Sequence, residues 1–165
     1  MSIQTTLKGV AVQAFIEWPA KRRSFERAAQ KLDATGQKLE ARFAKAEGTD
    51  AQKQTLRHII GIERWGQRRL WLAVRYSGES GVRSSEVAYS DAHHAYKPVE
   101  TASWNELIAK FKTTRQETVA LARYLADTET DEALTVPHND LGDLSLRGWL
   151  RYLRTHATFE ARKIR

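Results

Sequence analysis

Apolar side chains recur at helical spacing in four separate segments of this 165-residue chain, and this periodicity restricts its fold more than any other feature. In the clearest segment, 50–76, one helical face is apolar and the opposite face is basic. The apolar face consists of Ile59, Ile62, Gly66, Leu70 and Ala73, and the basic face of Arg57, Arg64, Arg68 and Arg75. Convincing strand-type alternation is absent. We therefore expect an all-α protein built as a four-helix bundle.

Local signals place the other three predicted helices. They cover residues 18–39, 103–126 and 145–165. Pro19 suits a first helical turn, where its missing N–H costs nothing, and Gly36 is a candidate break in that helix. Ser103, followed three residues later by Glu106, forms the pattern of a capping box and predicts the start of the third helix.

Two irregular connections separate these helices. The longer one, 77–102, joins the second and third predicted helices and carries Asp91, His93, His94 and Tyr96. Long connections of this kind are uncommon in compact domains and are often functional. The shorter one, 128–144, carries His138, which we expect to cap or brace the start of the last helix. No repeat or linker divides the chain, so we expect a single domain over 1–165.

Composition narrows the possible functions. The chain has no cysteine, which excludes disulfides, thiolate metal ligands and a cysteine nucleophile. No stretch without Lys, Arg, Asp or Glu is longer than eight residues, and the N-terminus lacks a signal-peptide core, so we expect a cytoplasmic protein without a membrane segment. The net charge of +7 indicates an anionic partner, either a nucleic acid or a small anionic metabolite.

The last predicted helix places two potential metal ligands together. Glu160 falls inside its apolar stripe, and His156 lies at the edge of that stripe one turn earlier. Burying a carboxylate is costly unless a partner compensates it. Side chains four residues apart on a helix point the same way, so this pair can bind one metal ion. The alternative is that Glu160 pairs with His156 or with an arginine from another helix.

His58 extends this pattern to a second helix. It lies at the margin of the apolar face of segment 50–76, close to Ile62. Two imidazoles and one carboxylate leave coordination positions open for water and substrate. Such a set is typical of a catalytic zinc site or of a two-His-one-carboxylate iron site. The alternative is an ordinary core histidine.

Three stretches of the chain resemble the DinB-like (DinB/YfiT) family of metalloenzymes. They are Leu56-Arg57-His58-Ile59-Ile60-Gly61-Ile62-Glu63-Arg64, then Val136 to Ser145, and Trp149-Leu150-Arg151-Tyr152-Leu153-Arg154-Thr155-His156 through Glu160. The resemblance implies that His58 and His156 are the first two ligands. Glu160 stands where the family usually has a third histidine, and a carboxylate there favours harder or less selective metals.

The resemblance also implies an activity. DinB-like proteins are associated with metal-dependent hydrolysis or with transfer of low-molecular-weight thiols to a small-molecule substrate, and homodimers are expected. A divalent ion, zinc or nickel first and iron or manganese next, would then activate a water or a thiol. The candidates for general acid, base or orienting residue are His94, Asp91, Glu63 and Tyr96.

Two other classes of function stay open. The arginine rows and Lys21-Arg22-Arg23 predict a basic surface that could bind nucleic acid with a steep salt dependence, although no recognition motif accompanies them. The replacement of the usual histidine by Glu160 also fits a non-catalytic bundle with a vestigial site. Polyanion binding that survives physiological salt would distinguish the nucleic-acid-binding protein from the enzyme, and absence of metal after purification would distinguish the non-catalytic bundle.

Overall fold

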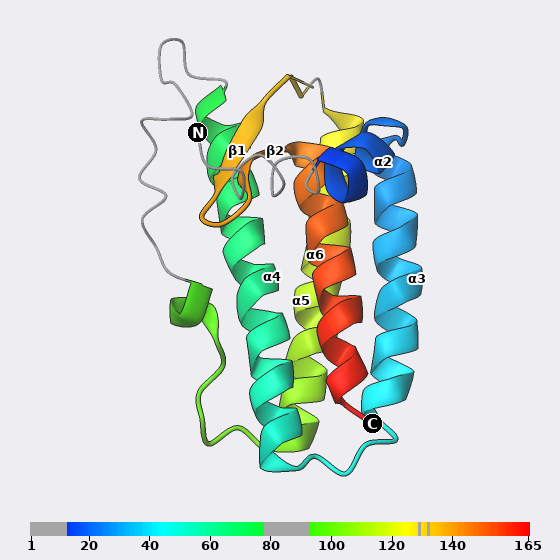
Figure 1. The fold of residues 1–165 in the computed structure, drawn as a ribbon, viewed down its shortest axis with the longest axis vertical. Helices are drawn as coiled ribbons and strands as arrows, with labels where there is room; N and C mark the ends of the chain where they lie inside the picture. Colours follow the sequence, from blue (N-terminus) through cyan, green and yellow to red (C-terminus); the bar gives the residue numbers. More distant parts are fainter. Residues whose placement is uncertain (1–12, 78–92, 129, 132) are drawn as a thin grey trace.

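The computed structural model describes residues 13–77, 93–128, 130–131 and 133–165, and this part of the chain is mostly helical (Figure 1). Its α-helices are α2 (Trp18–Lys21), α3 (Phe25–Phe43), α4 (Asp50–Ser77), α5 (Trp104–Asp127) and α6 (Leu146–Glu160). The described part also contains two strands, β1 (Thr135–His138) and β2 (Gly142–Ser145). One short π-helix, η1 (Gln13–Glu17), and two short 3-10 helices, η3 (His93–Tyr96) and η4 (Ala161–Lys163), complete it. The prediction of an all-α protein therefore agrees with the structure in that the described part is mostly helical, and the two-stranded sheet is the exception.

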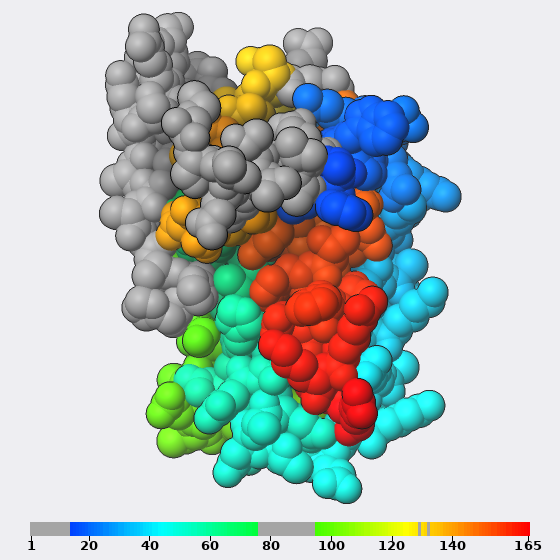
Figure 2. All heavy atoms as spheres, viewed as in Figure 1, coloured from blue at the N-terminus to red at the C-terminus, as the bar shows by residue number. Residues whose placement is uncertain are grey.

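The four long helices stand side by side, with the hairpin β1–β2 at one end (Figure 1). The main contacts join α3 to α5 and α6, and α4 to the same two helices, so α3 and α4 lie diagonally opposite each other. Apolar side chains from all four helices form two core clusters along their length. Among the described helices, none combines the length and apolar character needed to cross a membrane. Figure 2 shows the last turns of α6 at the surface beside α4.

The first predicted helix, 18–39, is divided at a different place from the one expected. α2 ends at Lys21, and Ser24 begins α3 as its N-cap, with its hydroxyl accepting a hydrogen bond from the Arg27 N–H at 3.2 Å. α3 then continues unbroken through Gly36. A Cβ at Gly36 would lie 2.6 Å from Cγ of Arg115 on α5. The glycine therefore serves close packing of α3 against α5, and the prediction of a break there is wrong.

The predicted starts of the second and third helices agree with the structure. α4 begins at Asp50, and α5 begins after Ser103 with both halves of the capping box formed. The last helix is shorter than predicted, because α6 ends at Glu160 and gives way to one turn of 3-10 helix, η4. Side chains three residues apart are aligned in a 3-10 helix, and Lys163 lies close to Glu160.

The hairpin β1–β2 was not predicted. Its strands pair antiparallel from Thr135 opposite Ser145 to His138 opposite Gly142, and Gly142 has a φ of 77°, which favours glycine. Strands of four residues are too short to produce a recognisable alternation in the sequence. Tertiary contacts hold the hairpin in place, among them the Trp149 indole N–H, which donates to the Val136 carbonyl at 2.9 Å.

His138 braces the hairpin ahead of α6, as expected. Its Nδ1 accepts from the backbone N–H groups of Asp140 at 3.1 Å and Leu141 at 3.3 Å. Its buried ring contacts those of Trp65 and Trp149 with centroids 5.1 Å apart in each case. These contacts fix the hairpin against α4 and α6.

Candidate metal centre

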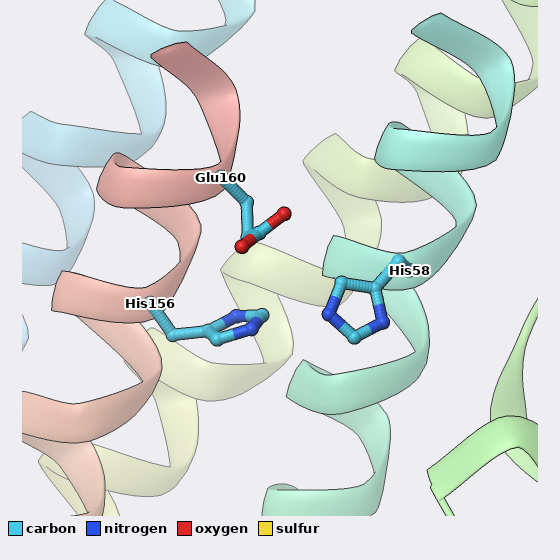
Figure 3. A group of neighbouring side chains, drawn as sticks. All are labelled: His58, His156 and Glu160. Atoms are coloured by element: carbon cyan, nitrogen blue, oxygen red, sulfur yellow. The ribbon is translucent and has the colours of Figure 1, made fainter. Parts of the chain in front are cut away.

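The structure brings His58, His156 and Glu160 together (Figure 3). His58 projects from α4, and the other two project from successive turns of α6 towards it. Each side chain offers one ligand atom, and these three atoms lie within 4.8 Å of one another. The two imidazole centroids are 5.0 Å apart and the rings are inclined by 67°. This group, half-buried throughout, could hold a metal ion.

Close packing of α4 on α6 makes this convergence possible. Gly66 lies on α4 two turns beyond His58, and a Cβ there would lie 2.7 Å from Cδ2 of the buried Leu153 on α6. A side chain at position 66 would therefore require Leu153 to shift. The N-terminus of α6 is fixed as well, because the buried Glu17 carboxylate accepts from both the Ser145 N–H at 3.0 Å and its hydroxyl at 2.9 Å.

Glu160 has a partner that the sequence analysis did not consider. The ammonium group of Lys163 donates to its Oε2 at 2.7 Å, in place of the arginine from another helix that was one alternative. Burial raises the pKa of Glu160, whereas Lys163 and the imidazoles of His156 and His58 lower it, and the net pKa lies below the usual range. The carboxylate is therefore ionised at neutral pH, as a metal ligand must be.

A groove runs along α6 next to this group. It has a volume of about 410 Å³, and His156 forms part of its wall. Most of the lining is apolar or aromatic, from Phe15, Ile16, Tyr152 and Phe159, with Arg151 as its one charged residue among those described. A ligand in the groove would thus contact His156 directly.

Tyr152 lies one turn before His156 and connects it to the hairpin. Its ring centroid is 5.6 Å from that of His156 and 4.6 Å from that of His138. Burial, together with the negative charges of Asp140 and Glu160, raises the pKa of Tyr152 to about 12. The phenol therefore keeps its proton at neutral pH and can act as a hydrogen-bond donor but not as a base.

Glu63, a predicted catalytic candidate, lies in a different environment. Its carboxylate accepts from Arg115 at 2.8 Å and from the Thr118 hydroxyl at 2.6 Å, both on α5. Burial raises the pKa of Glu63 against the lowering effects of Arg115 and Thr118, and the net direction is upwards. The side chain is thus engaged by α5, and it is not among the three residues grouped as possible ligands.

The remaining candidates come from the long connection 77–102. Asp91 lies outside the described residues. The backbone of His94 belongs to η3, and its side chain lies outside the described part. Tyr96, also in η3, is half-buried and packs against the core cluster that contains Trp65 and Trp149. Tyr96 is therefore the only one of these three candidates whose side chain the structure describes.

Sequence reasoning missed Lys163 and Tyr152. Both could have been found from helical spacing, since Tyr152, His156 and Glu160 follow one another at intervals of four residues. Lys163 lies three residues after Glu160, a spacing at which opposite charges commonly meet.

Comparisons with known proteins identified no relative of this chain. No protein-family model, curated protein or solved structure gives a significant match to the chain. The residues and their geometry are therefore the basis for assigning a function.

Proposed function

We propose that this protein is a divalent-metal-dependent enzyme of the DinB-like type, with α3, α4, α5 and α6 as its four-helix bundle. His58, His156 and Glu160 would hold the ion. The observation that carries the proposal is that three groups with the chemistry of metal ligands, from two helices distant in the sequence, lie within 4.8 Å of one another. Two histidines and one carboxylate leave open positions, as a catalytic site requires and a closed structural site does not.

The chemistry that such an ion supplies is activation of a nucleophile: it lowers the pKa of a bound water or of a substrate thiol towards neutrality. This fits either hydrolysis or transfer of a low-molecular-weight thiol. Zinc and nickel suit the two imidazoles best, and the carboxylate also accommodates iron or manganese.

The protein's own groups would position the substrate. The groove beside His156 is mostly apolar, so it favours a small molecule with an apolar or aromatic portion. Tyr152, held protonated, can donate a hydrogen bond to an oxygen or sulfur atom near His156.

Elemental mass spectrometry of the full-length, tag-free protein tests the metal site. We expect close to one equivalent of a divalent ion per chain after purification or after reconstitution with zinc, nickel, iron or manganese. The variants His156→Ala and Glu160→Gln should lose most of it. Glu47→Gln, at an exposed position outside the site, is the matched control and should retain wild-type content.

Lys163 provides a second, opposite test. Because its ammonium group competes with a metal ion for the Glu160 carboxylate, Lys163→Gln should bind metal several-fold more tightly than wild type. The expected gain is small, since Lys163 is 60% exposed and an ion pair so accessible to water is worth only about 0–1 kcal/mol. If neither wild type nor any variant binds metal after reconstitution, the proposal of a metal-dependent enzyme is refuted. The protein would then be a non-catalytic bundle in which Lys163 neutralises a vestigial Glu160.

A further inference from the structure

Five basic side chains line one pocket on the other side of α6, which we call the basic pocket. They are Arg23, Lys31, Arg147, Arg151 and Arg154. Arg23 lies between α2 and α3, Lys31 lies on α3, and the arginines at 147, 151 and 154 lie on α6. The rest of the lining is apolar, and no aspartate or glutamate is among the described residues that form it. Segments distant in the sequence therefore bring only positive charge to this place.

These cations are close enough to disturb one another. All five are half-buried, so water screens them less than it screens an exposed lysine or arginine. Burial lowers the pKa of Lys31, and the nearby charges of Arg23 and Arg154 lower it further. The pKa of Arg154 is lowered by burial first, and then by the neighbouring arginines. The positive charges around the pocket therefore repel one another.

Within the described part of the chain, no carboxylate pairs with Arg23, Lys31, Arg151 or Arg154 to relieve this repulsion. The ion pairs found there involve Asp50, Glu100, Glu63 and Glu160 with other partners. Arg151 uses its Nε–H to donate to the Phe15 carbonyl at 2.7 Å, which orients its guanidinium without neutralising it. A protein that places several half-buried cations around one concave pocket is suited to receive an anion there.

We propose that the basic pocket binds a phosphate group of a small molecule. Phosphate carries up to two negative charges and several acceptor oxygens, so it can be shared by several cations at once, and guanidinium groups bind its oxygens in pairs. A single carboxylate would neutralise only one of the five. Convergence on one pocket also favours a compact phosphate over an extended nucleic acid backbone, which would need cations spaced along a surface.

This site is separate from the candidate metal centre but adjoins its groove. Arg151 is the one residue common to the linings of the basic pocket and of the groove that contains His156. A molecule anchored by its phosphate in the basic pocket could extend towards His156. Phosphate binding itself does not depend on a metal ion, so the two proposals can fail independently.

Isothermal titration with inorganic phosphate and with pyrophosphate, at ionic strength held constant with sodium chloride, tests the proposal. We expect saturable binding to the full-length protein, weakened at least about tenfold in the double variant Lys31→Gln/Arg154→Gln, since each lost charge-assisted hydrogen bond alone is worth about that factor. Arg123→Gln, an exposed position on α5, is the matched control and should bind as wild type does. His156→Ala should also bind normally, which excludes binding through a metal.

A second readout keeps the test valid if the variants differ in stability. Removing two of the crowded charges should leave the phosphate-free double variant at least as stable as wild type, whereas phosphate should raise the melting temperature of wild type more than that of the variant. Equal phosphate effects in both proteins would overturn the proposal. Binding of a single-stranded oligonucleotide that phosphate and pyrophosphate do not displace would overturn it too, in favour of an extended nucleic-acid surface.

Discussion

Removing one partner of the buried Glu63–Arg115 pair is expected to destabilise the protein strongly, whereas removing both is not. The two side chains are each 2% exposed and are joined at 2.8 Å between α4 and α5. Breaking a pair of this kind leaves an uncompensated buried charge, which costs about 3–5 kcal/mol. For a protein of this length that corresponds to a fall in melting temperature of roughly 6–20 °C.

The double variant Glu63→Leu/Arg115→Met distinguishes the destabilisation caused by one unpaired buried charge from the net contribution of the ion pair to stability. Leucine and methionine fill most of the same volume, and replacement of a whole buried pair by apolar residues is often neutral. Thr118, which donates to Glu63, also donates to the Thr114 carbonyl at 3.0 Å and so stays hydrogen-bonded. We therefore expect the double variant to lose much less stability than the sum of the two single variants.

Urea unfolding of wild type, the two single variants and the double variant measures the coupling directly. Two outcomes contradict the reasoning: single variants that each lose less than about 1 kcal/mol, or a double variant whose loss equals their sum. Metal content of the double variant adds a check on function. It should match wild type, because Glu63 contacts α5 and is not among the grouped ligands.

Three further predictions concern stability. Gly36→Ala should lower the free energy of unfolding by about 1–3 kcal/mol despite the better helix propensity of alanine, because the new Cβ would lie 2.6 Å from Cγ of Arg115. An unchanged or higher stability in chemical unfolding contradicts this prediction. Leu153→Ala should cost about 2–5 kcal/mol by opening a cavity between α4 and α6, and a loss below about 1 kcal/mol would mean that the helices close the gap. The Ser103 N–H and hydroxyl lower the pKa of Glu106 in the folded protein, so this carboxylate stabilises α5 above its ordinary pKa, and the effect is lost as the pH falls through the lowered value. Melting temperatures of wild type and Glu106→Gln should therefore differ at pH 7 and converge in acid, and a constant difference would argue against the linkage.

Much of the fold could be predicted from local patterns. Apolar periodicity predicts the limits of α4 and α5, and a capping box predicts the start of α5. These signals depend on residues a few positions apart, so they can be recognised in the sequence. The hairpin β1–β2 could not be predicted in this way, because its strands are short and are held by contacts such as that from Trp149 to Val136. The break in the first predicted helix was misplaced for a similar reason. Gly36 allows close packing against Arg115 on α5, and this contact cannot be recognised from the sequence around Gly36.

The same division applies to the candidate site. Spacing alone placed His156 and Glu160 on one face of a helix and made them candidate ligands, because helical geometry fixes the direction of side chains four residues apart. Only the tertiary structure decided that His58 meets them, since its distance depends on how closely α4 packs on α6. It also decided that Glu63 is paired within the core and that five cations converge on one pocket. Charges and ligands that are far apart in the sequence are brought together by packing, and packing is a property of the whole chain rather than of any one segment.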